Sequence, residues 1–528
     1  PKGQILHGDP ALMRRAMTTL LAMLSLALVP GSRINADEMP WPTLKAGPHR
    51  VGFRTLDVTD YGRTVAPRID WRGVERPGDN FRQVRISLWY PAVVDEESRP
   101  MLYRDTVEAV GFETQMEGEL LVGVDAYVAH STFGGADEAT LRKMVEEPTT
   151  AFRDAVQLAG QHPVIVYASS FSYEPFENSA LFEYLASHGY IIAASRSSGP
   201  ETREMSADLA GVEASVRDLE LILDALHDVG HADLTRVGAA GFSWGALSAV
   251  MLGMRNFNAQ AVLALDGTFE HAEIPSIEEQ YDFRPRRLRG GYLAIVGDRE
   301  PARSLADDAL YTDLFELRYP DLMHWDFASD LIRIQVHSAG EPDAARRALV
   351  DEAYGLIAYQ ARLFFDAYLK GLEVNRQVLL EGNLRAMKPA VVIENLTARA
   401  ALPPPPSPAE FAMLLRADVE EARQVLDRVK KNDPEIELLD WMQLQDSVSV
   451  SPFATKLAIL ELAKEELGES SILFNNYGQA WRLEGDPEKA LGYFRKALAH
   501  NPDSGFAKKS IEELEAELAD QRKGRWSR

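Results

Sequence analysis

Short apolar runs alternate with helical segments along the first three quarters of the chain. Residues 84–90 alternate apolar and polar positions, as in a strand, and we expect that strand to end at Pro91. Mostly apolar runs of strand length follow at residues 163–167, 190–194, 236–240, 261–265 and 291–296. Helical spacing occupies residues 180–188, 212–226 and 245–254. Buried strands that alternate with helices predict an α/β fold with a mostly parallel central sheet over residues 47–398.

Two other stretches set the expected domain organisation. Residues 104–155 interrupt the alternation with weakly patterned sequence, which we interpret as an insertion over or beside the sheet. Five prolines crowd into residues 403–408, so residues 399–408 are predicted to be a stiff, extended linker. Beyond it, residues 409–528 follow helical spacing throughout, which predicts an all-α second domain.

Residues 471–504 form a unit of 34 residues within this helical region. Characteristic residues stand at fixed positions in it: Phe474, Tyr477, Gly478, Trp481, Ala490, Phe494, Ala497 and Pro502. This spacing resembles the tetratricopeptide repeat, a pair of packed helices, and residues 422–434 match part of the same pattern. We therefore expect degenerate repeats over residues 409–470. Such repeats either bind a protein partner through a concave face or serve as an inert packing appendage.

The N-terminal residues have the order of a secretory signal. Met13-Arg14-Arg15 is basic, residues 20–29 form an apolar run, and Ala36 is a small residue before an acidic pair. Residues 1–36 are therefore predicted to be an upstream extension followed by a signal peptide, which would make the protein secreted or periplasmic. The alternatives are an N-terminal membrane anchor or a buried helix, although the apolar run is short for a bilayer. We expect no transmembrane anchor after cleavage.

Composition and charge exclude several classes of function. The 528 residues include 80 acidic and 56 basic side chains, a formal net charge of −24. This balance argues against nucleic-acid binding, which needs a basic surface. The chain has no cysteine, which excludes disulfides, thiolate metal sites and a cysteine nucleophile. Its chemistry must therefore come from serine, histidine, carboxylates or a cofactor.

The pentapeptide Gly241-Phe242-Ser243-Trp244-Gly245 is the clearest catalytic motif. It stands between an apolar strand and a helix of small residues, the setting of a G-x-S-x-G nucleophile elbow. Such a turn holds the serine in a strained conformation, so side chains two residues away must be nearly absent. The backbone N–H of Trp244 would begin the helix and could stabilise an oxyanion. The alternative interpretation is a glycine pair at a helix start with no catalytic role.

A serine nucleophile needs a base, and in this architecture the chain order is serine, acid, histidine. His324 stands in a loop before a predicted helix, a position that suits a mobile general base; a surface histidine is the alternative. Asp266 and Asp298 each follow a predicted strand, at the sheet edge where catalytic groups gather. Either carboxylate could orient the imidazole, and spacing alone does not decide between them.

Several segments together resemble the platelet-activating-factor acetylhydrolase family of α/β-hydrolases, and dienelactone-hydrolase-like esterases are similar. The segments are the elbow and residues 86–92, 163–167, 264–267 and 324–327, in a likeness that covers roughly residues 47–375. The resemblance favours Asp266 as the acid, because the family's acid follows the strand after the nucleophile helix. It also places the second oxyanion donor at the backbone of Phe171. Here the family usually has His-Gly, whereas this chain has Ala168-Ser169-Ser170-Phe171-Ser172.

The resemblance implies a calcium-independent serine esterase that acts on a small ester or lipid through an acyl-enzyme. It calls for no metal and no organic cofactor, and the sequence has no H-E-x-x-H, P-loop, EF-hand or Rossmann motif. Tyr173 and Trp325 are candidates for lining a substrate pocket, or else plain core or rim residues. Two other functions stay open. One is a different acyl enzyme on the same triad, such as an amidase, peptidase, acyltransferase or polyester hydrolase; the other is a degenerate hydrolase that serves as a binding protein.

Overall fold

The computed structural model describes residues 41, 43–65, 81–116, 119–133, 136–201, 203–267, 283–299, 304–336, 344–382, 391–434 and 436–526. The predicted signal segment, residues 1–36, lies outside these residues. The chain divides into two compact units, Pro1–Leu402 and Pro403–Arg528. Among the helices described, none is long and apolar enough to cross a membrane.

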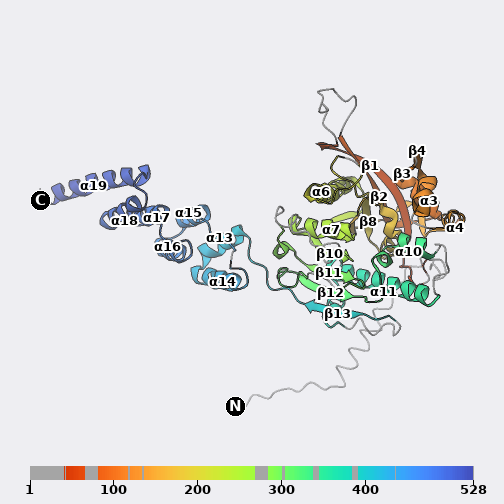
Figure 1. Ribbon diagram of the computed structural model, residues 1–528. Helices are drawn as coiled ribbons and strands as arrows, with labels where there is room; N and C mark the ends of the chain where they lie inside the picture. The colour runs from red at the N-terminus through yellow and green to blue at the C-terminus, as the bar shows by residue number, and fades with distance from the viewer. Residues whose placement is uncertain are drawn as a thin grey trace, which may run out of the picture. The chain divides into compact units, whose positions relative to one another are not determined.

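An 11-stranded sheet forms the centre of the first unit (Figure 1). Its strand order is β13-β12-β11-β10-β9-β7-β8-β2-β1-β5, and β6 pairs with β2. Strands β12 to β8 in this order are parallel, while β13 and β2 join them antiparallel on the two sides. This arrangement confirms the mostly parallel α/β sheet predicted from the apolar runs. The strands are β1 (Arg50–Thr64), β2 (Phe81–Val93), β5 (Ala151–Arg153), β6 (Val156–Gln157), β7 (His162–Ala168), β8 (Ile191–Ser195), β9 (Ala232–Phe242), β10 (Ala259–Leu265), β11 (Gly291–Val296), β12 (Asp313–Arg318) and β13 (Glu394–Arg399).

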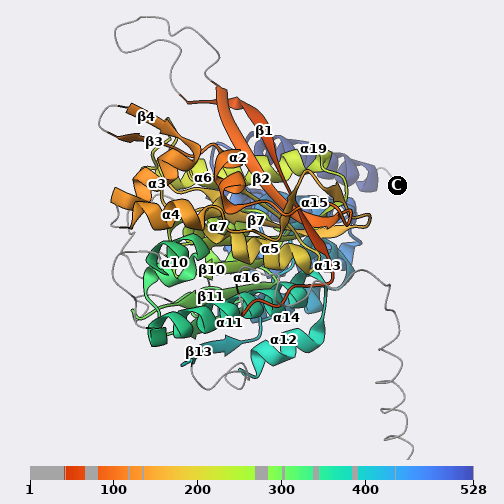
Figure 2. The ribbon, with the colours of Figure 1, turned by 90° about the vertical axis from the view of Figure 1, so that its right-hand side faces the viewer.

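Alternate residues of each strand pack against helices on opposite faces of the sheet. Along β7, Ile165 and Tyr167 share a core with α5 and α11, the face seen in Figure 2. Val164 and Val166 belong to a second core that includes residues of α6 and α7. Both faces are thus covered, as a parallel sheet requires. The helices and short turns of this unit are α5 (Ser179–Ser187), α6 (Leu209–Ala225), α7 (Trp244–Arg255), α10 (Ser329–Val336), α11 (Ala344–Leu369), α12 (Glu373–Leu380), η2 (Pro175–Asn178), η3 (Leu226–Asp228), η4 (Pro285–Arg287) and η5 (His324–Phe327).

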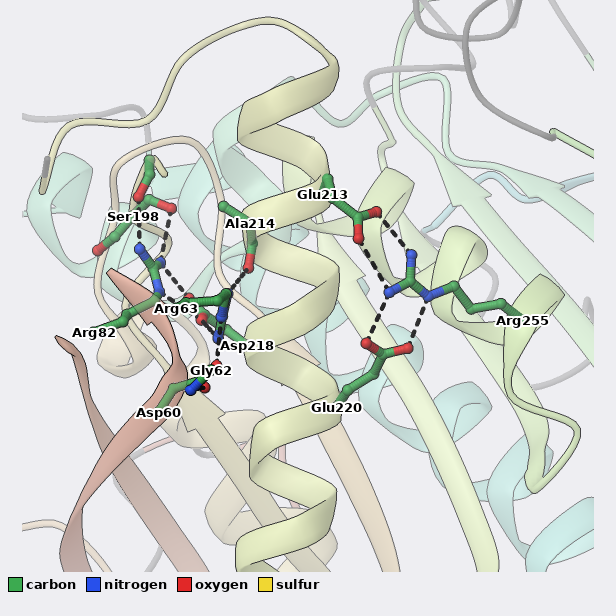
Figure 3. A network of polar contacts seen from close by, with 11 residues as sticks. Asp60, Gly62, Arg63, Arg82, Ser198, Glu213, Ala214, Asp218, Glu220 and Arg255 are labelled. Carbon is green, nitrogen blue, oxygen red and sulfur yellow. Dashed lines mark hydrogen bonds and ion pairs between the residues drawn. The ribbon is translucent and has the colours of Figure 1, made fainter. Parts of the chain in front are cut away.

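Arginines anchor helix α6 on two sides (Figure 3). Arg82, on β2, donates to the buried carboxylate of Asp218, with its Nε 2.7 Å from Oδ1. Arg255, which ends α7, contacts Glu213 and Glu220 at 2.7 Å. Because two-pronged guanidinium–carboxylate contacts fix orientation as well as distance, α6 is tied to both β2 and α7.

Residues 104–155 fold beside the sheet edge. They form α2 (Tyr103–Val110), the hairpin of β3 (Glu113–Met116) and β4 (Glu119–Val122), α3 (Gly123–Phe133) and α4 (Glu138–Met144). Buried aromatic side chains of this region pack with Phe176, next to the sheet. Strand β5 then joins the main sheet parallel to β1, which the sequence pattern did not indicate because β5 has only three residues.

The prediction that the first strand ends at Pro91 is wrong, because β2 continues to Val93. Strand β8 pairs with β2 only as far as Trp89. Pro91, which has no N–H to donate, therefore lies beyond that ladder and does not interrupt it.

The second unit is helical. Its helices are α13 (Pro408–Ala417), α14 (Val419–Asn432), α15 (Trp441–Val450), α16 (Phe453–Leu467), α17 (Ser471–Leu483), α18 (Pro487–His500) and α19 (Gly505–Trp526). Helices α17 and α18 pack closely, since a Cβ on Gly478 would lie 2.8 Å from the Phe494 ring. Before this unit, the amides of Ala401 and Leu402 still donate to the first unit, at Asp313 and Leu310.

Candidate active site

Ser243 is the single residue between the end of β9 and the start of α7. Its backbone has φ 56° and ψ −120°, a conformation that L-residues rarely adopt. A Cβ on Gly241 would lie 2.2 Å from the Gly245 carbonyl oxygen, and one on Gly245 would lie 2.0 Å from that of Ala168. Both positions therefore admit only glycine, for the steric reason expected of a nucleophile elbow.

His324 lies directly opposite the Ser243 hydroxyl. Its Nε2 is 2.9 Å from Ser243 Oγ, and its Nδ1 is 2.5 Å from Asp266 Oδ2. The imidazole also lies against the Phe242 ring, with 4.8 Å between the ring centroids. The imidazole is therefore bonded through both nitrogens and packed on one face, and this geometry suits transfer of a proton from the hydroxyl.

The carboxylate beside His324 is that of Asp266, which follows β10. It is 3% exposed, and its Oδ1 accepts the Gly297 N–H at 2.8 Å. Asp298 follows the neighbouring strand β11, where its own amide donates to the Leu322 carbonyl at 2.7 Å. Of the two acids left open by the sequence, the structure thus brings Asp266 to the imidazole.

The loop after β7 forms a turn beside the elbow. The Tyr173 N–H donates to the Ser170 carbonyl at 3.0 Å, which places Phe171 and Ser172 at the centre of the turn. Ser172 takes the left-handed φ of 55° that glycine would favour, and its Oγ accepts the Met205 N–H. The Phe171 ring meets the Trp244 ring edge-on at 5.6 Å, so the turn lies over the helix start.

The predicted pocket residues have different surroundings. Trp325 and Phe171 are 49% and 43% exposed, and Trp325 lies next to the His324 ring. Tyr173 is instead directed away from solvent, since its hydroxyl donates to the buried Asp330 at 2.7 Å. Burial, reinforced by that carboxylate, raises the pKa of Tyr173 well above its usual value. Trp325 and Phe171 therefore contribute exposed apolar surface at the site, together with Met323, which precedes His324.

Buried carboxylates that the sequence analysis missed support the loops around the site. Asp330 accepts hydrogen bonds from Tyr103, Tyr127 and Tyr173, and burial raises its pKa. Glu177 accepts the amide and the hydroxyl of Ser170. No local sequence signal marks Asp330, because its tyrosine partners lie 157 to 227 positions away in the chain.

Asp326, in the turn that contains His324, is also structural. Its Oδ2 accepts the Met323 N–H at 2.7 Å and pairs with Arg346. Burial raises the pKa of this carboxyl, while the backbone contact and Arg346 oppose the rise. These contacts fix the short η5 turn that presents the imidazole.

A cavity of about 420 Å³, lined mostly by charged and polar residues, opens at the end of β8, near Ser195 and Arg196. Arginines in its wall are held by acids, as in the contacts of Arg196 and Arg203 with Glu174. The positive and negative charges of the cavity wall therefore offset one another, and the cavity has no strong potential of one sign that would concentrate a charged ligand. Within the described ranges, no group of three or more side chains is placed to hold a metal ion.

Comparison with known proteins adds two findings. Residues 471–504 match the tetratricopeptide repeat family, which confirms the repeat predicted for this segment. Among solved structures, the chain is similar to a ferulic acid esterase from Streptomyces cinnamoneus, with 22% sequence identity and a TM-score of 0.42. That match covers 62% of this chain and 93% of the esterase chain. No curated protein matches the sequence.

Proposed function

We propose that the first unit is a serine esterase that hydrolyses carboxylic esters through a triad of Ser243, His324 and Asp266. The observation that carries the proposal is the unbroken contact of the three side chains, with the serine at a strained elbow. An activated hydroxyl in this setting is typical of acyl transfer. The position of the acid after β10, the strand that follows the nucleophile helix, supports an enzyme similar to platelet-activating-factor acetylhydrolases.

The reaction has two acyl-transfer steps. His324 Nε2 takes the hydroxyl proton as Ser243 Oγ forms a bond to the ester carbonyl carbon, while Asp266 stabilises the imidazolium. The imidazolium then donates this proton to the leaving alcohol oxygen as the C–O bond breaks, which leaves an acyl-enzyme. Water, deprotonated by the same imidazole, attacks the acyl carbon; the bond from this carbon to Ser243 Oγ then breaks, the imidazolium returns the proton to Oγ, and the carboxylic acid leaves.

The backbone N–H groups of Trp244 and Phe171 would stabilise the oxyanion formed in each step. Trp244 is the first residue of α7, where N–H groups lack partners within the helix. Phe171 belongs to the turn that lies over this helix start. The two amides therefore come from segments that meet beside the nucleophile.

The substrate class follows from the exposed side chains around His324. Trp325, Phe171 and Met323 are large, apolar and at least 43% exposed. They would contact an apolar acyl or alcohol group, as in a small ester or a lipid. Only the carbonyl group then needs polar contacts from the protein.

Hydrolysis of p-nitrophenyl acetate, butyrate and octanoate tests this function. We expect Ser243→Ala to lower kcat by at least about a thousandfold. Ser248→Ala is the matched control, since Ser248 is a buried serine of α7, the helix that follows Ser243, and its hydroxyl has no hydrogen-bond partner among the described residues. Wild-type activity no greater than that of Ser243→Ala would favour a binding protein on a degenerate hydrolase scaffold.

A protein partner for residues 409–528 is a second part of the proposal. The tetratricopeptide match supports it, as does Leu483, which ends α17 and is 73% exposed. Affinity capture with the wild-type chain and with Leu483→Glu tests it. A partner retained by the first and lost by the second supports recognition through this helix, and an identical set of captured proteins contradicts it.

Export completes the proposal, on the basic, apolar and small-residue order of residues 13–36. The test is N-terminal sequencing of protein recovered outside the cytoplasm. A mature N-terminus near Asp37 would support it, and retention of the segment on cytoplasmic protein would contradict it.

A further inference from the structure

Glu177 is a fully buried acid that the catalytic mechanism does not use. It stands in η2, and both of its carboxylate oxygens are directed to a single residue of the turn after β7. Ser170 donates its amide to Oε1 at 3.0 Å and its hydroxyl to Oε2 at 2.6 Å. Two contacts to one residue fix both the position and the orientation of that residue.

Ser170 is the first residue of the turn that carries Phe171. Its carbonyl accepts the Tyr173 N–H, so Glu177 holds the residue on which the turn closes. The neighbouring Ser169 is anchored separately, through a hydroxyl that donates to the Ser195 carbonyl at 2.8 Å. The backbone before Phe171 is therefore held by two side-chain contacts.

The same short segment also holds the element that follows His324. The Ser329 hydroxyl donates to the Glu177 carbonyl, and the Ser329 amide donates to Asn178 Oδ1, both at 3.1 Å. Ser329 begins α10, immediately after the turn that presents the imidazole. Residues 177–178 thus join the two loops that meet at Ser243.

We propose that Glu177 is a positioning residue that holds the turn of Ser170 to Tyr173 so that the Phe171 amide points to the developing oxyanion. This inference rests on the proposed esterase function. An oxyanion donor contributes to the rate only when it lies near 3 Å from the charge, and a shift of about 1 Å costs about a hundredfold. Loss of the Glu177 contacts would permit such a shift.

Glu177 keeps its contacts with Ser170 whether its side chain is ionised or neutral. Burial raises its pKa to about 8, against hydrogen bonds from Ser170 and Tyr167, while the negative charge of Asp330 on α10 adds to the rise. The carboxylate accepts from the Ser170 hydroxyl, whereas the neutral acid donates to it. Glutamine at this position can reproduce the neutral arrangement.

The test compares Glu177→Leu with Glu177→Gln and with a matched control elsewhere. Glu183, on α5, is also buried and accepts the amide and hydroxyl of one residue, Thr150, at 2.8 and 2.6 Å. Two readouts are measured on the whole protein: kcat and KM for p-nitrophenyl butyrate, and hydrogen exchange of the Ser170 and Tyr173 amides.

We expect Glu177→Leu to raise exchange at both amides at least about tenfold and to lower kcat about ten- to a hundredfold, with KM within about twofold. Glu177→Gln should restore most of the wild-type kcat and most of the wild-type protection of the two amides from exchange. Glu183→Leu should raise exchange at Thr150 and leave kcat near wild type. If Glu177→Leu does not fold, Ser170→Ala removes the hydroxyl contact alone and should shift kcat and Tyr173 exchange in the same direction by a smaller factor.

Unchanged exchange in Glu177→Leu would overturn the inference, as would raised exchange with unchanged kcat. An equal loss of kcat in Glu183→Leu would also overturn it, because general destabilisation would then explain the effect. If the wild-type protein has no Ser243-dependent hydrolysis, the esterase function and the catalytic role of Glu177 both fail. The exchange measurement still decides in that case whether Glu177 holds the turn.

Discussion

The imidazole of His324 lies 2.5 Å from the carboxylate of Asp266, although 58 positions separate the two residues in the chain. The second oxygen of this carboxylate accepts the Gly297 N–H, from the segment that carries the other candidate acid. Asp266 also has a left-handed φ of 42°, which turns its backbone at the end of β10. The neighbouring strand thus supplies a support for the acid.

Replacement of the acid should distinguish the two aspartates. We expect Asp266→Asn to lower kcat/KM about a thousand- to ten-thousandfold, because an amide no longer favours the tautomer with a proton on Nδ1. Asp298→Asn should stay within about threefold of wild type, since the Asp298 contacts described above use its backbone. Steady-state kinetics with p-nitrophenyl butyrate measure both. The reverse ranking would assign the acid to Asp298.

Gly245→Ala should prevent the nucleophile elbow and the turn after β7 from packing together correctly. The new Cβ would lie 2.0 Å from the Ala168 carbonyl oxygen, so either α7 or the loop after β7 must move. We expect kcat to fall at least about a hundredfold in the soluble protein, since this displacement reaches the nucleophile and the turn. Gly230→Ala is the control, because no atom lies within 4 Å of its Cβ position. Wild-type kinetics in Gly245→Ala would contradict the elbow packing.

Stability should depend on pH through Glu177. Because its pKa rises from 4.5 to about 8 on folding, the folded protein holds a proton between these values that the unfolded chain lacks. The stabilisation of the folded state by this proton is complete below about pH 4.5 and declines as pH rises toward 8. The free energy of unfolding therefore falls across this window.

Urea unfolding of the wild type and of Glu177→Gln at pH 5, 6.5 and 8 measures this effect. Relative to Glu177→Gln, the free energy of unfolding of the wild type should fall by up to about 4 kcal/mol from pH 5 to pH 8, because glutamine does not titrate. Other buried acids titrate in both proteins and cancel. A difference that is constant with pH would show that Glu177 keeps an ordinary pKa.

In the second unit, two glycines should respond oppositely to alanine. A Cβ on Gly478 would press on the Phe494 ring, so we expect Gly478→Ala to destabilise the helical unit by about 1–3 kcal/mol. Gly492, within α18, has open space at its Cβ position, and Gly492→Ala should stabilise by up to about 1 kcal/mol. Thermal unfolding followed by circular dichroism measures both. Equal effects would indicate that α17 and α18 do not pack as described.

The sequence was sufficient for features whose cause is local. The elbow was predictable because its glycines lie within two residues of Ser243, although Gly245 must also be small because it packs against the Ala168 carbonyl, from a distant part of the chain. The tetratricopeptide unit was predictable because all of its characteristic residues lie within 34 consecutive positions. In both cases the pattern that identifies the feature lies in one short window of the sequence.

Features that depend on distant contacts were not predictable. Asp266 and Asp298 follow adjacent parallel strands and end at the same edge, so strand position alone could not separate them. Asp330 gathers tyrosines from far away, since 227 positions separate it from Tyr103. Only the folded chain shows which of the many carboxylates are buried against such donors.

The placement of β13 has a consequence for synthesis. This strand covers the outer edge of β12, yet residues 394–399 are among the last of the first unit to leave the ribosome. Until they emerge, the nascent sheet exposes the unpaired backbone of β12, an edge that invites pairing with another chain. Premature termination before residue 394 would therefore release a polypeptide with an open, aggregation-prone edge, whereas termination after Leu402 would leave that edge closed.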